Sequence, residues 1–244
     1  MIIVVSATTG FAKTQDIQTF TADYNGKDKE TYAKIEAAFK ANGFTMIEAN
    51  DMNKPFKAKF KGGDDYHTYR LMFAYNPKLT TKLADSYPSI GLLAPLTGSI
   101  YSKHGKKITI STLSLNGMSK ITGIPTTNRD LINLQKSVQD AMKSALPSGK
   151  FVALNYDIKK PTGELISSVS GVFDPEEDLE EAKEGFQEEF EGEMETAGFV
   201  IAGFNAFNED MPNSKYDFFD TYSICKLDVI YPAHKLHPEV GAFA

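Results

Sequence analysis

Hydrophobic and polar positions along the chain follow two periods, one of two residues and one of three to four. The shorter period is typical of strands and the longer one of amphipathic helices. The pattern predicts strand, helix, strand, strand, helix, strand, strand and helix, at residues 17–24, 28–42, 44–49, 69–75, 77–83, 91–101, 107–115 and 131–146. This order favours an α+β fold, a two-layer α/β sandwich with helices on one face of a mostly antiparallel sheet.

Residues that start and stop elements agree with these bounds. Asn25-Gly26 is a turn dipeptide that ends the first strand, and Asp28 is expected to cap the helix that follows. Gly43 suits the left-handed position at the end of that helix. The Lys-rich stretch that ends in Gly62-Gly63 is expected to be a loop.

A second pass of the same kind begins after Ser148-Gly149, which we take as the seam between two domains. Residues 151–158 are predicted to form a strand. Asp174 is expected to cap a helix, because a Pro occupies the first helical position after it and a Glu follows where a capping box needs one. Gly198 is expected to end this acidic helix, and another strand follows.

The two passes match at a constant spacing. Five pairs are 155 residues apart: Gly43 and Gly198, Asn50 and Asn205, Asn53 and Asn208, Asp65 and Asp220, and Pro77 and Pro232. After a gap of five residues, three pairs are 150 apart: Pro88 and Pro238, Gly91 and Gly241, and Ala94 and Ala244. The alternative is chance, since Gly and Pro mark turns anywhere. We predict a duplication, with a first copy at 13–147 and a divergent, C-terminally incomplete copy at 148–244.

One run of the sequence resembles a known family. The run YNPKLTTKLADSYPSIGLLAPLTGSIYS at 75–102 is similar to the domain of unknown function 302 family. The matching features are an Asn-Pro pair, a Pro before an aliphatic strand, and a Pro near the end of the motif; here they are Asn76-Pro77, Pro88, Ile90-Gly91-Leu92 and Ala94-Pro95-Leu96. The family often has Asp-Leu-Pro where this chain has Leu-Ala-Pro. The resemblance covers residues 29–146 well and the second copy only in part.

This resemblance implies a compact two-layer α/β fold that tends to pair into dimers. It implies no activity, because the family has none established. Two copies in one chain are therefore expected to form an intramolecular pseudo-dimer, and a homodimer is the alternative.

Charge is distributed unevenly between the two predicted copies. Residues 1–147 hold 19 Lys and Arg against 12 Asp and Glu, whereas the remainder holds 7 against 20. The basic residues are scattered and lack an aromatic stacking platform, so the pattern does not favour nucleic-acid binding. Opposite charges favour attraction between the copies. Lys54, Lys57, Lys59 or Lys61 is expected near the acidic helix at 175–197.

The N-terminus indicates export. A short apolar run is followed by Gly10-Phe11-Ala12, which fits a signal-peptidase site after Ala12. We take residues 1–12 as the remainder of a signal peptide and expect a periplasmic protein of bacterial type. The alternative is that residues 2–9 form an ordinary first strand. The apolar stretches after this one are too short for a membrane span.

The second copy holds the sequence's one cluster of metal-ligand type. Cys225, His234, His237 and Glu239 offer thiolate, imidazole and carboxylate groups, which suit zinc, copper or haem iron. The alternative is that these are polar loop residues and that Cys225 is a small buried strand residue. With one cysteine, the chain has no internal disulfide.

The first copy holds a candidate ligand site. Tyr75 and Asn76 lie where a strand ends and a helix begins, a place where free backbone amides can bind a ligand. Tyr87 and Tyr101 could line the same pocket. The alternative is that Asn76 is a turn and cap residue, and that the tyrosines belong to the core.

Together these features favour an exported binding module without an assignable catalytic site. Its ligand, a small molecule or a partner protein, is expected at the interface between the copies. The second hypothesis is a periplasmic protein that handles redox equivalents, a metal or haem through the cluster of the second copy. A hydrolase ranks third, because no nucleophile and base can be paired. The sequence leaves any cofactor unknown.

Overall fold

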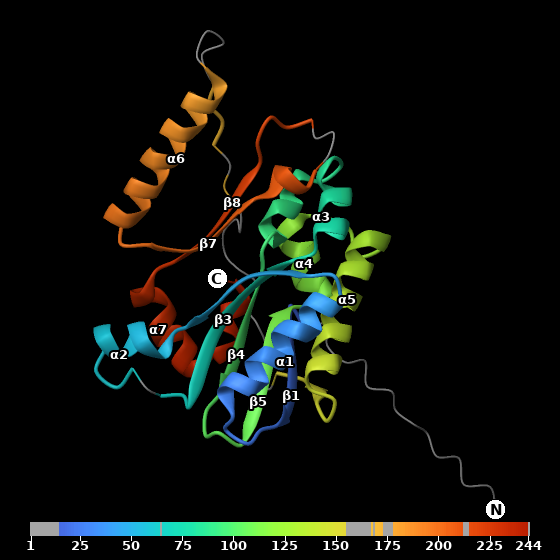
Figure 1. The fold of residues 1–244 in the computed structure, drawn as a ribbon, viewed down its shortest axis with the longest axis vertical. Coiled ribbons are helices and arrows are strands. Elements are labelled where there is room, and N and C mark those ends of the chain that lie inside the picture. Colours follow the sequence, from blue (N-terminus) through green and yellow to red (C-terminus); the bar gives the residue numbers. More distant parts are fainter. Residues whose placement is uncertain are drawn as a thin grey trace, which may run out of the picture.

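A computed structural model of the chain describes residues 15–63, 65–154, 167, 169–172, 178–211 and 215–243, and it has a mixed α+β fold (Figure 1). We call residues 15–154 the first region and residues 178–243 the second region. The first region comprises β1 (Ile17–Asp23), α1 (Asp28–Ala41), β2 (Thr45–Asp51), α2 (Asn53–Lys59), β3 (Thr68–Tyr75), α3 (Pro77–Ala84), the 3-10 helix η1 (Pro88–Leu93), β4 (Leu96–Ser102), β5 (Lys107–Leu113), α4 (Leu115–Thr122), α5 (Arg129–Ala145) and β6 (Lys150–Val152). The second region comprises α6 (Leu179–Thr196), β7 (Val200–Ala206), the 3-10 helix η2 (Phe207–Asp210), β8 (Asp220–Cys225), α7 (Leu227–Leu236) and the 3-10 helix η3 (Pro238–Phe243).

Two antiparallel sheets organise these elements. The first region contributes six strands in the order β2-β3-β4-β5-β1-β6, and the second region contributes the pair β7-β8. Every pairing is antiparallel. The predicted α+β class with a mostly antiparallel sheet is therefore confirmed.

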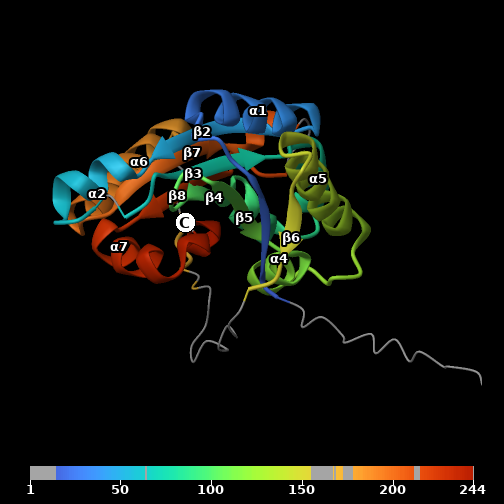
Figure 2. The same ribbon diagram turned by 90° about the horizontal axis from the view of Figure 1, so that it is seen from below.

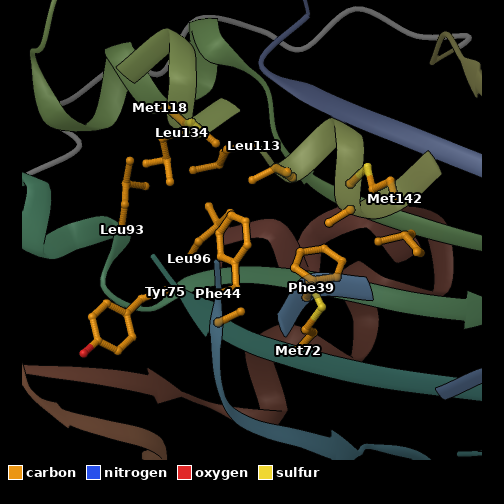
Figure 3. Close-up of a cluster of buried hydrophobic side chains, with 14 of the residues drawn as sticks. Phe39, Phe44, Met72, Tyr75, Leu93, Leu96, Leu113, Met118, Leu134 and Met142 are labelled. Carbon is orange, nitrogen blue, oxygen red and sulfur yellow. The ribbon is translucent and has the colours of Figure 1, made fainter. Parts of the chain in front are cut away.

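Side chains of β3 alternate between two hydrophobic clusters, one on each face of the large sheet. Met72 and Ala74 belong to the cluster under α1 and α5, together with the ring of Phe39 (Figure 3). Tyr69 and Phe73 belong to a second cluster on the opposite face. Because successive side chains of a strand point to opposite faces, a strand with apolar side chains on both faces must be covered on both sides.

The second region supplies the cover for this opposite face. Helix α1 lies on one side of strands β3 and β4, and α7 lies on the other side (Figure 2). The 3-10 helix η3 contacts both β4 and β5. Tyr69 donates its hydroxyl proton to the Pro238 carbonyl at 3.0 Å, and Ser99 donates to the same oxygen at 2.8 Å.

After β1, the first region has the order α1-β2-α2-β3-α3-η1, and the second region has the similar order α6-β7-η2-β8-α7-η3. Thr45 pairs with Tyr75 in one strand pair, and Val200 pairs with Cys225 in the other. Both strand pairs shift register between the second and fourth residues of their first strand. Gly43 and Gly198 precede these strands with φ angles of 85° and 81°.

The spacing between the two regions changes earlier than the sequence suggested. Pro77 is the first residue of α3, whereas Pro232 lies inside α7, so the expected correspondence of these two prolines is wrong. Leu227, which is 150 residues after Pro77, is the first residue of α7 and therefore corresponds to Pro77. The five-residue difference therefore falls before β8, in the connection between the two strands, where Asp65 had been paired with Asp220.

Several other expected features differ from the structure. The Lys-rich stretch contains helix α2, and residues 115–122 form α4, which was not expected. Lys27, rather than Asp28, occupies the N-cap position of α1. The segment 91–93 belongs to η1 instead of a strand. Local caps explain α4, because the Ser114 hydroxyl accepts from the Gly117 amide at 3.2 Å.

The start of the second region also differs from the expectation. Strand β6, which follows the predicted seam at Ser148-Gly149, pairs with β1 of the first region, and the ring centroids of Phe20 and Phe151 lie 4.8 Å apart. Residues 155–158 of the predicted strand and Asp174 with its capping motif lie outside the described residues. The described helix α6 begins at Leu179.

A candidate binding cleft between the two regions

A cleft of about 940 Å³ opens where the second region meets η1 and α4 of the first. Both regions contribute to it. The first region lines it with Asp16, Pro88, Ser89, Gly91, Leu92, Leu93, Pro95, Thr97, Leu113, Gly117, Lys120 and Ile121, and the second region with Phe219, Asp220, Thr221, Tyr222, Ser223, Ile224 and Ala242. The walls are largely apolar, with a few polar groups, as is usual in ligand sites.

One wall of the cleft is formed by η1. A Cβ atom added to Gly91 would lie 2.8 Å from the ring of Phe219, so a larger residue here would require that ring to shift. The Thr221 hydroxyl donates a hydrogen bond to the carbonyl of Ala94, just after η1. Leu92 remains 49% exposed and presents an apolar side chain to the cleft.

Two sets of charged groups line the cleft. Lys120 pairs with Asp16 at 2.6 Å, which neutralises both. Asp220 receives a hydrogen bond from Gln187 on its Oδ2 atom at 2.7 Å, and Lys183 lies 4.0 Å from the same atom. The Oδ1 atom of Asp220 is buried, and it has no hydrogen-bond partner among the described residues. Burial raises the pKa of this carboxyl above its ordinary value.

The four candidate ligand residues do not line this cleft. The Asn76 side chain accepts from the Leu79 amide at 3.0 Å and caps α3. Tyr75 is buried against Phe207 in the hydrophobic cluster under α1 and α5, and the half-buried Tyr87 packs against this cluster. Tyr101 lies on the opposite face of the sheet. The structure thus separates Tyr101 from the other three.

The four candidate metal ligands do not form a metal centre. Throughout the part of the chain that is described, no group of three or more His, Cys, Asp and Glu is placed to hold a metal ion. Cys225 is buried in β8, and burial raises the pKa of its thiol. His237 lies 3.7 Å from the carboxylate of Glu239, whereas the Nδ1 atom of His234 lies 2.5 Å from the Tyr231 carbonyl oxygen. The expected metal cluster is therefore not assembled in the described structure.

Two of these residues, His234 and Glu239, instead belong to a buried contact with aromatic residues of the first region. The ring of His234 stacks on Phe56 with centroids 4.4 Å apart. Burial lowers the pKa of His234 and raises the pKa of Glu239. The hydroxyl of Tyr66 donates to the His234 carbonyl at 3.0 Å, and burial raises the pKa of Tyr66 to about 12. These directions favour the neutral forms, as expected for interface residues removed from water.

Sequence reasoning missed Asp220 as a site residue and used it only as a marker of the repeat. Its position at the start of a short strand gives no signal of a cleft. The glycines were the available signal, since Gly91 and Gly241 recur at the same place in both passes. A recurrent glycine can mark a close backbone approach as well as a turn.

Comparison with known proteins places the first region in a family. The family model described as domain of unknown function DUF302 matches residues 19–147. The chain belongs to this family. A crystal structure described as an uncharacterized conserved DUF302 protein from Bacillus stearothermophilus is similar to this chain, with 16% sequence identity and a TM-score of 0.45. The match covers 52% of this chain and 97% of that one. A search of curated proteins returned no match.

The DUF302 match ends at residue 147, so it does not include the second region. Within the described residues, none of the helices combines the length and the apolar character that a membrane crossing requires.

Proposed function

We propose that this DUF302 protein is a non-catalytic binding module in which the second region is a partial copy of the first. The two copies pair within one chain, and the cleft at their junction holds the ligand or partner. The observation that carries this proposal is the shared lining of the cleft, since neither region alone would enclose it.

Reciprocal contacts support the copy relationship. Gly241 of η3 faces the large sheet, where an added Cβ would lie 2.6 Å from Leu71 and 2.8 Å from Ser99. Gly91 of η1 faces the small sheet and meets Phe219. Gly241 of η3 thus lies against β3 of the first region, and Gly91 of η1 lies against the start of β8 in the second region. This exchange is the pattern expected from a two-fold relation between similar surfaces.

Apolar contacts support pairing within the chain. Phe60 of the first region stacks on Tyr231 of α7 with ring centroids 4.2 Å apart, and Phe56 lies 5.3 Å from the same ring. On the other side of the junction, Phe207 of η2 is buried in the cluster of the first region. Buried aromatic contacts of this kind supply most of the energy of an interface.

Charge contributes at the rim, although not where the sequence suggested. Lys59 pairs with Asp228 of α7 at 2.7 Å, and Lys235 pairs with Asp65 at 3.2 Å. The sequence placed Lys54, Lys57, Lys59 or Lys61 beside the acidic helix, whereas the partner of Lys59 belongs to the next helix along the chain, α7. Exposed pairs contribute roughly 0–1 kcal/mol each and mainly orient the surfaces.

A fragment screen of the complete chain tests the binding proposal. Small apolar molecules with one hydrogen-bond donor would be screened by ligand-observed NMR against the wild type, Leu92→Asp and Leu236→Asp. Leu92 lines the cleft, whereas Leu236 is 78% exposed on α7 and serves as the control. We expect ligands that bind the wild type and the control but lose affinity for Leu92→Asp. Ligands that all bind Leu92→Asp unchanged would contradict a site in this cleft.

We further propose that the protein is exported to the periplasm and cleaved after Ala12. Gly10-Phe11-Ala12 supports this proposal. Residues 1–12 lie outside the described residues, and the first described strand starts at Ile17. N-terminal sequencing of protein made from the full natural gene should begin at Lys13. A cytoplasmic protein that retains residues 1–12 would contradict export.

A further inference from the structure

Within the described residues, strand β8 has an unpaired edge that opens onto the cleft. In the described sheets β8 pairs with β7 alone, whereas β3 pairs with β2 on one side and β4 on the other. Six consecutive residues, 219–224, line the cleft. Alternate side chains of a strand point to opposite faces, so a run of consecutive residues can share one cleft only along a strand edge. The cleft therefore follows the backbone of β8.

The first region shows which kind of segment pairs with the corresponding strand edge. Strands β3 and β8 hold the same position in the element order, and each pairs with the preceding strand in the same register. On the remaining edge of β3 lies β4, with Met72 opposite Gly98 and Ala74 opposite Leu96. The occupant of that edge is an extended segment of seven residues. The geometry of β8 suits an occupant of the same kind.

The chemistry of the cleft agrees with an extended peptide. Along an antiparallel edge, alternate residues present an N–H and a C=O group outward, and an unpaired edge of this type is a template for an added strand. Leu92 and Ile121 provide apolar surface for the alternate side chains of the occupant. Asp220 lines the cleft at one end of the strand, and its carboxylate can accept a hydrogen bond from the occupant.

From these observations we infer that the cleft binds an extended peptide segment of a partner protein, which adds to β8 as an antiparallel strand. The segment carries apolar side chains at alternate positions and a hydrogen-bond donor near Asp220. This inference rests on the proposed binding function and names the chemical class of the partner. Strand addition of this kind draws its affinity from main-chain hydrogen bonds and its selectivity from the alternate side chains.

A second copy of the chain fits this edge less well. The edge is enclosed by η1 and α4 on the far side of the cleft. Two β8 edges could meet only if both enclosing walls moved away. A single extended segment needs no such movement, because it enters along the cleft.

The test uses the complete, isotope-labelled chain and a synthetic peptide with the sequence of residues 95–103, which contains β4. A control peptide carries proline in place of Gly98 and Ile100, because proline removes the backbone donors that strand addition requires. We expect the first peptide, at millimolar concentration, to slow amide hydrogen exchange in β8 at least tenfold. The control peptide should leave the exchange unchanged.

Two protein variants locate the binding. Leu92→Asp should weaken peptide binding at least tenfold, whereas Leu236→Asp should bind like the wild type. Three results would each overturn the inference. They are unchanged amide exchange in β8, equal binding of the proline peptide, and slower exchange that sedimentation traces to a dimer of the chain. The peptide could show no binding while small molecules bind the wild type and lose affinity for Leu92→Asp. That result would support the proposed binding module and contradict the inference of a peptide partner.

Discussion

The two regions share an order of elements but differ in how far each one is closed. Helix α1 buries Ile35, Ala38 and Phe39 and contacts the neighbouring helix α5. Helix α6 holds the same place in the second region, yet Ala182 is its one buried residue with a described side chain, and Phe186 is 60% exposed. Figure 1 shows α6 standing away from the other helices. The second region therefore obtains its burial from the first region rather than from its own helix.

This difference assigns a separate role to each side of the second region. Its α7 and η3 side is fixed on the large sheet through buried contacts, which makes it part of the common core. Its α6 and β8 side keeps an exposed helix and an unpaired strand edge within the described residues. Regions with few buried contacts are those that open and bind most readily.

The largest expected effect comes from an aromatic residue at the junction. Phe56 is fully buried between the regions, so Phe56→Ala should lower the free energy of unfolding by about 3–5 kcal/mol. Phe186→Ala on α6 is the matched control and should change it by roughly 0.5 kcal/mol or less. Urea unfolding at pH 7 measures both. Equal decreases in the free energy of unfolding for the two variants would mean that both sides of the second region are packed equally well.

The next effect concerns the close approach of η3 to the sheet. Gly241→Ala places a Cβ against Leu71 and Ser99, and overpacking of this kind costs about 1–3 kcal/mol. Among the described residues, a Cβ added to Gly192 on α6 would meet no atom within 4 Å beyond the helix's own backbone, so Gly192→Ala should be neutral or stabilise by up to ~1 kcal/mol. Thermal unfolding compares the two. A Gly241→Ala variant as stable as the wild type would show that η3 does not dock as described.

A smaller effect depends on pH. Burial raises the pKa of Glu239, so the folded state binds this proton more tightly than the unfolded state does. The stabilisation from this proton is present in acid and is lost as pH rises through the raised pKa. Glu239→Gln should therefore melt higher than the wild type at pH 7, and the difference should shrink toward pH 4.

The exposed Glu195 on α6 lies away from the contact between the regions, so Glu195→Gln is the control for this substitution. A Glu239→Gln variant that gains stability equally at both pH values would indicate a cause other than the buried charge. Melting temperatures at a series of pH values in one buffer system decide between these outcomes.

The smallest effect is expected at the rim. Lys59→Ala removes the exposed pair with Asp228 and should cost roughly 0–1 kcal/mol. The cost should fall further at high salt, because screening already weakens the pair. Denaturant unfolding at two salt concentrations measures it. A loss as large as that of Phe56→Ala would show that charge, rather than apolar burial, holds the regions together.

The sequence predicted the elements whose pattern is local. The hydrophobic period located α1, β3 and α5, and Gly43 was correctly placed at a left-handed helix end. Helix α2 was missed because its Lys-rich composition is also typical of a loop. Its one buried residue is Phe56, and that residue is buried by α7, far away in the sequence.

The cleft and the fate of the proposed metal ligands could not be predicted for the same reason. His234 and Glu239 have the composition of ligands, but their environment is created by tyrosines of the first region. Asp220 became a site residue only because β8 lies beside η1. Contacts between distant segments decide these roles, and a periodic pattern contains no information about them.

Pairing of the two regions within one chain is the central claim, and sedimentation of the complete chain and of separately produced segments 15–154 and 155–244 tests it most directly. We expect the complete chain to sediment as a monomer. The two segments should associate at both low and high salt, because the contact is mainly apolar and salt affects only its charged rim. The contrary result is that the two segments do not associate at any salt concentration while the complete chain forms stable dimers. It would show that pairing occurs between molecules.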